Sequence, residues 1–354
     1  MRGRHRPGWF VRVGAAITVC ALVLTPPGTA YAHPPGVQAA VDYRVTVAGV
    51  TPAAAGVTAR FIDDGSRLEL RSDSRTVEVL GYDGEPMLRV GPGGAWQNVK
   101  SPSLYVDQPG ASARAGASAK VEPVWQQTSG RMLVRWQDHR ALWHGNPPPQ
   151  VRADPSRVHR VSDWTVRVRI DTVPGEITGS TEWVPPPSPG GWALTILVFA
   201  AAIAAAGALW RRRGSLARTV LVATGLCVGT AAVAYEILVA AHNAEPGAGA
   251  FLLTLINRPA EVLLGLALIV LALTVLAGRA GAAVLLIITG AATAFLVGLR
   301  NLALLSHAVA PVGVDPFWAR LGVAVIVGGG AGLLGFALVH VILASQPVPR
   351  PASP

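Results

Sequence analysis

Four residues in the first half of the chain have side chains that bind metal ions in many proteins. They are His33, Asp138, His139 and His144. An N-terminal histidine chelates Cu(II) through its α-amine and a ring nitrogen, and a second histidine completes a nitrogen-rich planar set. His33 takes the N-terminal position if a leader is cleaved after Ala32. These residues therefore predict a copper site outside the membrane, with copper as the cofactor.

The same segment also has a structural interpretation. Asp138 and Arg140 lie two positions apart, so on a strand they share one face and pair locally, while Trp136 packs inward. Pro34 has no N–H and cannot add its amide to a chelate at the N-terminus. A ligand or partner surface is a third interpretation. The sequence leaves these three alternatives open.

Catalytic motifs are absent from the sequence. Serine, histidine and aspartate all occur, but no nucleophile elbow, H-E-x-x-H pair or glycine-rich phosphate loop accompanies them. The three glycines at 328–330 lie inside an apolar segment of helical length. We therefore expect a non-enzymatic protein.

A second set of polar residues lies in and beside the apolar segments of the second half, at a similar depth. Charged side chains in membranes usually pair with one another or line a wet cavity. We predict that Arg300 pairs with Glu236 or Glu261. The set is interpreted either as a structural layer of ion pairs or as a small polar site for an ion or ligand. This intramembrane polar layer comprises Glu236, His242, Arg258, Glu261, Arg300, Asn301 and His307.

Five apolar segments follow residue 191, and each is long enough to cross roughly 30 Å of bilayer hydrocarbon as a helix. Trp192 and Trp210 mark the interfaces of the first helix, and the basic run 211–213 follows it. Short basic loops stay cytoplasmic, so this helix runs from outside to inside and the C-terminus is cytoplasmic. The third helix begins at either Phe251 or Pro259, because the full segment is longer than the hydrocarbon requires. The segments are 192–210, 216–241, 251–277, 282–305 and 319–344.

The chain before these segments divides into a leader and a β domain. Residues 1–32 hold four arginines, a short apolar core and an Ala-Tyr-Ala end, which predicts a cleaved signal peptide; an uncleaved anchor is the alternative. Apolar and polar residues alternate in short runs within 33–184, which predicts an all-β, immunoglobulin-like sandwich. Residues 185–191 form a Pro/Gly linker, 192–344 an all-α five-helix transmembrane bundle, and 345–354 a cytoplasmic tail. The alternating runs are 43–47, 68–70, 76–80, 87–90 and 164–170, with turns expected at 64–65, 83–84, 91–92 and 174–175.

The net charge of +10 does not indicate a nucleic-acid partner. Four of the excess positive charges lie in the leader. Residues 33–191 hold 17 basic and 16 acidic residues, a net charge of +1, and residues 192–354 hold nine arginines and four acidic residues, a net charge of +5. The excess lies beside helix ends, where it sets topology. Neither of the two cysteines falls in the β domain, so we expect no disulfide there.

Two segments resemble a known family. Residues 80–90 (LGYDGEPMLRV) and 136–143 (WQDHRALW) are similar to segments of an uncharacterised family of exported multi-pass membrane proteins from high-GC Gram-positive bacteria, which has no established activity. The family often has one more histidine before the aspartate and another before the final tryptophan, where this chain has Gln137 and Leu142. The resemblance implies the layout of leader, β domain and membrane helices, and the two replaced histidines argue against a strict metal requirement.

Together these patterns predict a multi-pass plasma-membrane protein whose β domain is extracytoplasmic. We expect this domain to be a binding or interaction module in envelope assembly or sensing. The alternative function is metal handling through His33. The expected partners are the lipid bilayer and another envelope or membrane protein.

Overall fold

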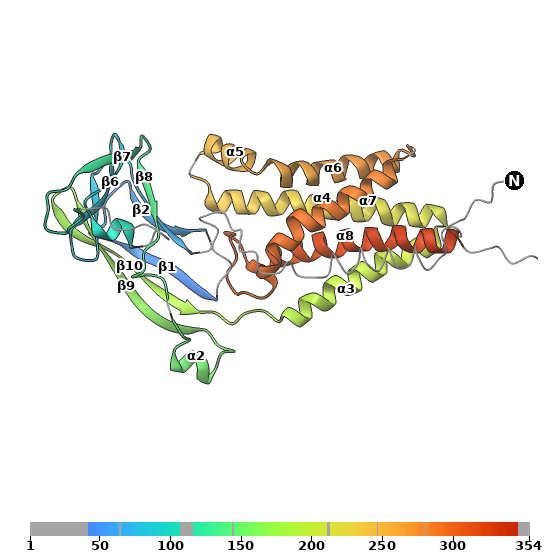
Figure 1. The fold of residues 1–354 in the computed structure, drawn as a ribbon, viewed down its shortest axis with the longest axis horizontal. Coiled ribbons are helices and arrows are strands. Elements are labelled where there is room, and N and C mark those ends of the chain that lie inside the picture. Colours follow the sequence, from blue (N-terminus) through green and yellow to red (C-terminus); the bar gives the residue numbers. More distant parts are fainter. Residues whose placement is uncertain are drawn as a thin grey trace, which may run out of the picture. The chain divides into compact units, whose positions relative to one another are not determined.

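The structure, a computed structural model, describes residues 42–63, 65–106, 116–143, 145–210, 213–245, 247–279 and 281–345. The predicted leader, His33, His144 and most of the predicted tail lie outside these residues. The chain forms two compact units (Figure 1). The β unit extends to Pro187 and also includes Ser306–Pro316, whereas the helical unit comprises Ser188–Leu305 and the chain from Phe317 onward. The predicted combination of a β domain and a helical bundle is confirmed.

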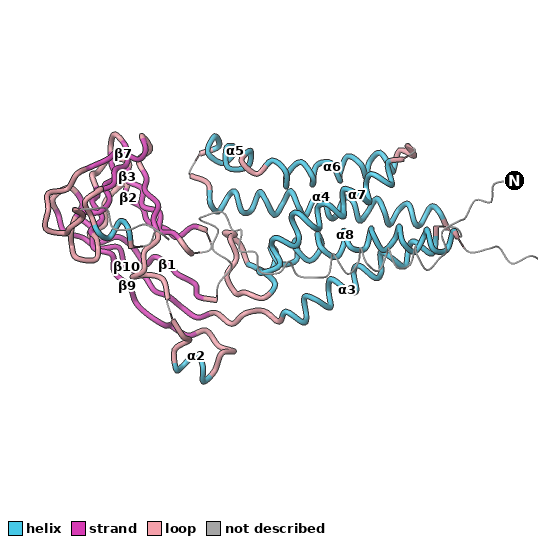
Figure 2. The backbone as a smooth tube through the Cα atoms, viewed as in Figure 1, coloured by secondary structure: helices cyan, strands magenta, loops and turns pink. Residues whose placement is uncertain are grey.

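The described part of the β unit contains two sheets in which every pair of neighbours is antiparallel (Figure 2). The larger sheet has the order β1-β10-β9-β4-β5-β6-β7, and the smaller has the order β2-β3-β8. The strands are β1 (Tyr43–Thr51), β2 (Val57–Ile62), β3 (Arg67–Ser72), β4 (Val77–Leu80), β5 (Pro86–Gly91), β6 (Gly94–Asn98), β7 (Trp125–Ser129), β8 (Leu133–Trp136), β9 (His159–Ile170) and β10 (Val173–Trp183). Two short helices, η1 (Pro102–Tyr105) and α2 (Pro149–Ala153), lie in the connections.

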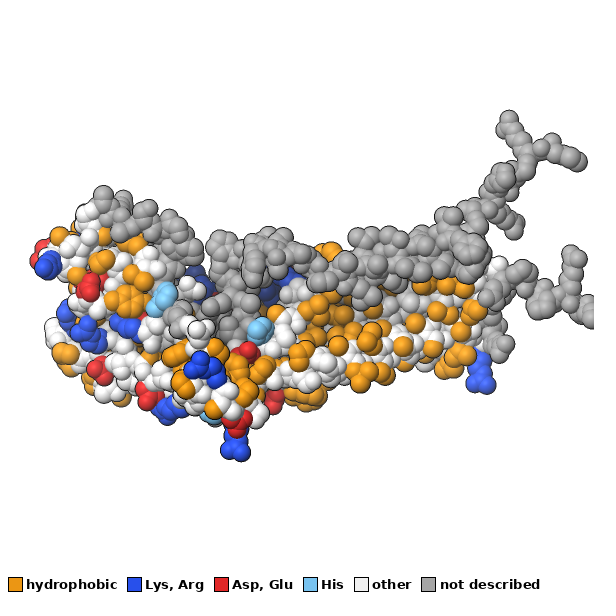
Figure 3. Space-filling model, turned by 60° about the horizontal axis from the view of Figure 1, so that its bottom comes forward, with side chains coloured by type: hydrophobic (Ala, Val, Ile, Leu, Met, Phe, Trp, Pro, Cys, Tyr) orange, Lys and Arg blue, Asp and Glu red, His pale blue; other side chains and the backbone are white. Residues whose placement is uncertain are grey.

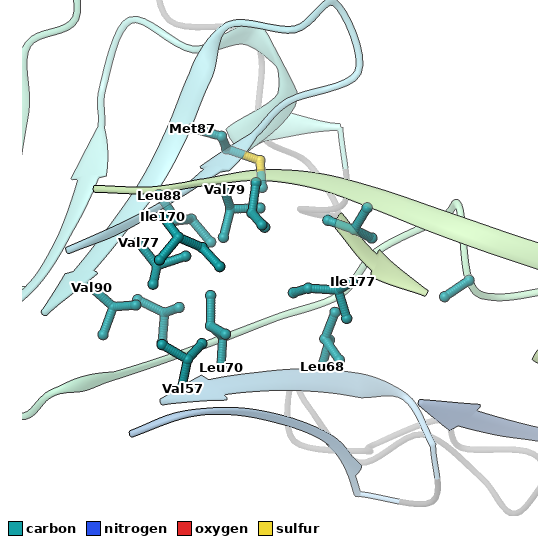
Figure 4. Packing of buried hydrophobic residues seen from close by; sticks show 14 of the residues in the cluster. Val57, Leu68, Leu70, Val77, Val79, Met87, Leu88, Val90, Ile170 and Ile177 are labelled. Carbon is teal, nitrogen blue, oxygen red and sulfur yellow. The ribbon is translucent and has the colours of Figure 1, made fainter. Parts of the chain in front are cut away.

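The hydrophobic core of the β unit lies between the two sheets. Val57, Leu68 and Leu70 come from the smaller sheet, and Val77 and Ile177 come from the larger (Figure 4). Alternate residues of a strand point to the same face, so the polar residues between them face away from the core. The five alternating runs seen in the sequence fall on β1, β3, β4, β5 and β9, because each of these strands has one face on this core.

One expected turn lies elsewhere. Residues 174–175 belong to β10, where Pro174 pairs with Arg169 of β9. The hairpin turns instead at Asp171, whose φ of 54° is a left-handed conformation that aspartate tolerates better than most residues. Pro174 is tolerated in this strand because β1 ends at Thr51, before it reaches the position opposite Pro174, so no N–H is needed there.

Each sheet carries a glutamate held between two arginines of the neighbouring strands. In both groups the glutamate lies directly opposite each arginine in the strand register. The small-sheet triad is Glu69 of β3 with Arg60 of β2 at 2.7 Å and Arg135 of β8 at 2.6 Å. The large-sheet triad is Glu78 of β4 with Arg89 of β5 and Arg169 of β9, each at 2.7 Å.

Five segments of the described helical unit are long and apolar enough to cross a membrane. Large aliphatic side chains such as Leu197, Leu263 and Ile288 are exposed on them, and hydrophobic side chains cover the visible face of the helices (Figure 3). Such a surface is favourable in lipid and unfavourable in water, and the protein is therefore a multi-pass membrane protein. The spans are formed by α3 (Pro189–Ala206) with η2 (Gly207–Leu209), α4 (Gly214–Asn243), α6 (Pro259–Leu276), α7 (Ala282–Thr293) with η3 (Ala294–Gly298) and η4 (Leu299–Leu305), and α8 (Pro316–Ala344).

The third span begins at Pro259. A separate helix, α5 (Ala248–Ile256), precedes it, and the chain leaves the helical conformation at Arg258, with φ −120° and ψ 54°. Proline suits the first helical position, where its missing N–H would have no partner. Of the two starts that the sequence allows, Pro259 is the one that the structure adopts.

The fourth span changes helix type twice. It is α-helical to Thr293, π-helical over Ala294–Gly298 and a 3₁₀-helix over Leu299–Leu305. Within this change the Asn301 side-chain amide donates to the Val297 carbonyl oxygen at 2.7 Å. A π-helical turn is rare and occurs frequently at functional sites, so this part of the span is a candidate functional site.

Glycines allow the helices of the chain to pack closely. A Cβ at Gly229 of α4 would lie 2.6 Å from the Gly265 carbonyl oxygen of α6. A Cβ at Gly298 would lie 2.6 Å from the side chain of Val327 in α8. These two glycines therefore serve contacts between helices of the same chain.

Candidate functional site

The two segments that resemble the exported family meet in the β unit. Residues 80–90 contain the turn between β4 and β5, and residues 136–143 begin at the end of β8. The His139 backbone N–H donates to the Tyr82 hydroxyl oxygen at 3.1 Å, and the Arg140 guanidinium lies over the Tyr82 ring, 4.9 Å from its centre. Burial raises the pKa of Tyr82, so its hydroxyl stays protonated at neutral pH. We call the group formed by Tyr82, Glu85, Asp138, His139 and Arg140 the loop cluster.

Asp138 is the buried centre of the loop cluster, with 1% of its surface exposed. Its Oδ1 accepts hydrogen bonds from Nε and from the backbone N–H of Arg140, at 2.8 and 3.1 Å. Its Oδ2 accepts from Nη2 of Arg140 at 2.7 Å and from Nε1 of Trp136 at 2.9 Å. Asp138 pairs with Arg140, as the two-residue spacing predicts, but the pair lies after the end of β8 and not on a strand.

The described residues do not assemble the four predicted copper ligands. His33 and His144 lie outside them, and His139 is exposed. Both carboxylate oxygens of Asp138 are engaged by protein donors, so a metal ion would have to displace Arg140. In the part of the chain that the structure describes, no group of three or more His, Cys, Asp or Glu residues is placed to hold a metal ion. Copper binding stays a prediction.

Glu85 is a buried carboxylate that fixes the turn of the loop cluster. Its Oε1 accepts hydrogen bonds from the Ser101 hydroxyl at 2.6 Å and from the Ser103 backbone N–H at 3.3 Å. Burial alone would raise the pKa of Glu85, but the hydrogen bonds from Ser101 and Ser103 outweigh it and lower the pKa. A side chain at Gly81 would collide with this carboxylate. The Tyr82 N–H donates to the Ser103 hydroxyl at 2.8 Å, so η1 and the turn hold each other in place.

His307, which the sequence assigns to the polar layer, lies in a segment that belongs to the β unit by its contacts. The Asp42 carboxylate accepts the Ala308 backbone N–H at 2.8 Å and lies 3.4 Å from Nδ1 of His307. Ser306–Pro316 connects the fourth and fifth spans along the chain, yet it belongs to the β unit by its contacts. His307 and Asp42 are 265 positions apart, so no local pattern in the sequence signals their contact.

Two ion pairs lie toward one end of the helical unit. Nη1 of Arg258 lies 2.6 Å from Oε2 of Glu236, and Nη1 of Arg300 lies 3.0 Å from Oε1 of Glu261. Of the two partners predicted for Arg300, Glu236 and Glu261, the structure pairs Arg300 with Glu261. The Glu236 side chain is only 1% exposed and also interacts electrostatically with Glu261 and Arg300, so the four charges form one group. We call these four residues the charged cluster.

Two uncharged side chains extend the charged cluster. The Tyr235 hydroxyl donates to Oδ1 of Asn301 at 2.9 Å and joins α4 to η4. Sequence reasoning missed Tyr235, although a tyrosine directly before Glu236 in an apolar helix is a signal that could have found it. His242 is half-buried in the last turn of α4.

The two clusters differ in what they can do chemically. The polar groups of the loop cluster form hydrogen bonds within the protein and hold two connections of the β unit in fixed positions. The charged cluster places two guanidinium groups near one end of the membrane spans. A comparison of the chain with protein-family models, curated proteins and solved structures found no match.

Proposed function

We propose that the protein is a membrane-anchored, non-enzymatic binding module whose β unit lies outside the plasma membrane and recognises a protein or another envelope component. The loop cluster is the observation that supports this proposal most. Its buried core of Asp138 and Arg140 fixes the surrounding loops, and it leaves Asp83 and His139 exposed. Binding residues concentrate on loops that a rigid scaffold positions, and these loops have that construction.

The chemistry of the exposed part favours a polar partner. Asp83 offers a carboxylate and His139 an imidazole, and Arg140 lies over the Tyr82 ring. Because the backbone beneath these groups is held by hydrogen bonds, little conformational entropy is lost when a ligand binds. A surface of this kind suits recognition in envelope assembly or sensing.

The order of the spans supports the proposed orientation. Arg213 follows the first span and Arg279 follows the third, and short basic connections stay on the cytoplasmic side. The β unit precedes the first span, so the same rule places it outside. The exported family that the chain resembles has the same layout, and we propose that the chain belongs to this family.

Photocrosslinking in intact cells tests the proposed surface. A photoreactive residue replaces His139 in the full-length chain, and the matched control carries it at Val173, an exposed residue in the hairpin of β9 and β10. We expect a discrete adduct from position 139 and none from position 173. Tyr82→Phe removes only the hydroxyl that accepts the His139 N–H, and it should weaken the adduct. Equal adducts at both positions, or none at 139, would contradict the proposal.

A further inference from the structure

The charged cluster lies about one hydrocarbon thickness from the opposite ends of α4, α6 and α7. At a rise of about 1.5 Å per residue, Glu236 is about 33 Å along α4 from its first residue. Arg258 is about 27 Å from the last residue of α6, and Arg300 is about 27 Å from the first residue of α7. The hydrocarbon layer is about 30 Å thick. If the opposite ends of these helices lie at one boundary of the hydrocarbon, the charged cluster lies at the other.

At the level of these charges the third span begins and the fourth span loses its regular α-helix. Arg258 lies in the break between α5 and α6, and Arg300 follows directly after the change from η3 to η4. Interrupted membrane helices commonly form ligand sites, because their ends present backbone groups and side chains at one level. Here the side chains at that level are the two arginines.

Both guanidinium groups retain hydrogen-bond donors. Within the described structure, Arg258 gives one hydrogen bond to Glu236, and Arg300 gives one to Glu261. A guanidinium carries five N–H donors in a planar fork, so each arginine keeps donors for a further acceptor. The side chains of Arg258 and Arg300 are 30% and 50% exposed, respectively. Donors at the edge of the hydrocarbon need an acceptor, and lipid phosphates are the most abundant anionic acceptors at that depth.

We propose that Arg258 and Arg300 bind the phosphate of a phospholipid headgroup at this end of the helical unit. Guanidinium and phosphate match in geometry, because two N–H groups meet two oxygens in a charge-assisted pair. Glu236 and Glu261 hold the two arginines in position. This site goes beyond the proposed function of the β unit and does not rest on it.

The charge of the site determines which phospholipids it takes. Two arginines and two glutamates balance each other, so attraction comes from directed hydrogen bonds more than from net charge. Zwitterionic and anionic phospholipids should therefore both bind, and salt should have little effect on binding. A lipid without phosphate should bind poorly.

Lipid titration of the full-length protein in detergent, read by native mass spectrometry, tests the site. The probes are phosphatidylethanolamine, phosphatidylglycerol and the phosphate-free monogalactosyl diacylglycerol, with matched acyl chains. The double variant Arg300→Gln with Glu261→Gln removes a guanidinium without leaving its carboxylate unpaired. The matched control is Arg279→Gln, an exposed arginine at the other end of α6.

We expect both phospholipids to bind the native protein about tenfold more tightly than the phosphate-free lipid, a difference of about 1.4 kcal/mol. The double variant should lose this preference and the control should keep it. Equal binding of the phosphate-free lipid to the native protein would overturn the proposal without any variant. So would a folded double variant that keeps the preference. Displacement of the lipid by inorganic phosphate at equal concentration would overturn the assignment to a lipid.

Discussion

Burial of a carboxylate costs free energy unless its oxygens are paired, and both oxygens of Asp138 accept hydrogen bonds from neighbouring residues. The spacing of Asp138 and Arg140 in the sequence predicts their pairing. It does not predict the hydrogen bond from Trp136 or the burial, because both depend on how the loop folds onto the strands. Tertiary packing therefore determines whether Asp138 is available as a metal ligand or is engaged in an ion pair.

Removal of the Asp138 charge should destabilise the β unit. Asp138→Asn leaves the Arg140 guanidinium without its counter-ion in a mostly buried position, so we expect the free energy of unfolding to fall by about 3 kcal/mol. Thermal unfolding of the full-length protein, followed by near-UV circular dichroism, measures the change. The control is Asp163→Asn, which breaks an exposed pair with Arg160 and should cost less than about 1 kcal/mol. Equal losses from both substitutions would contradict this role of Asp138.

Glu85 makes the stability of the β unit depend on pH. Its folded pKa is lowered, so its contribution is complete above the ordinary pKa of about 4.3 and is lost as the pH falls below that value. The melting temperature of the native protein should therefore fall as the pH drops below about 4.3. Glu85→Gln should melt at a lower temperature at pH 7 and lose less on acidification. A Glu85→Gln profile parallel to that of the native protein would show that other groups cause the fall.

At the scale of elements, the two arginine–glutamate triads connect three strands each. The alternation of residues in β3 and β4 predicts that Glu69 and Glu78 face away from the core. The partners are beyond such a prediction, because Arg135 is 66 positions from Glu69 and Arg169 is 91 positions from Glu78. Pairings between distant strands depend on the register of the whole sheet.

The centre of a triad should matter more than its edge. Glu69→Ala leaves Arg60 and Arg135 on either side of an empty position, so two like charges face each other across it. Arg60→Ala leaves the pair of Glu69 and Arg135 intact. We expect Glu69→Ala to lower the free energy of unfolding by about 3 kcal/mol and Arg60→Ala to lower it by about 1 kcal/mol. Urea unfolding of the full-length protein in detergent measures both changes. The explanation would be wrong if the arginine substitution proved the more costly.

The helices should tolerate a side chain poorly where their backbones touch. Gly229→Ala places a Cβ 2.6 Å from the Gly265 carbonyl oxygen and should force α4 away from α6, at a cost of about 1–3 kcal/mol. Gly249→Ala in α5 is the matched control, because nothing lies within 4 Å of its Cβ position. Melting temperatures of the two variants in detergent measure the difference. A Gly229 variant as stable as the control would show that the contact is not tight in solution.

At the scale of the whole molecule, the membrane spans were the most predictable part. A long apolar run must form a helix in lipid to satisfy its backbone, so hydropathy alone locates it. The sequence allowed two starts for the third span, and only the structure places it at Pro259. The break before Pro259 also determines which charged side chains pair. It lets Arg258 reach Glu236, whereas spacing along the chain pointed only to a partner for Arg300. Nor did the sequence predict that Ser306–Pro316 belongs to the β unit, since that grouping rests on contacts across the whole chain.

The proposed function requires the β unit to lie outside the membrane and the connection after the third span to lie inside. The most direct measurement is cysteine labelling in intact cells with a membrane-impermeant maleimide, in a background with Cys20→Ser and Cys227→Ser. One variant carries a cysteine at Asp83 and the other at Arg279, both of which are exposed. We predict labelling at position 83 in intact cells and at position 279 only after the membrane is permeabilised. Labelling at 279 in intact cells with none at 83 would reverse the orientation and contradict the proposed extracytoplasmic binding module.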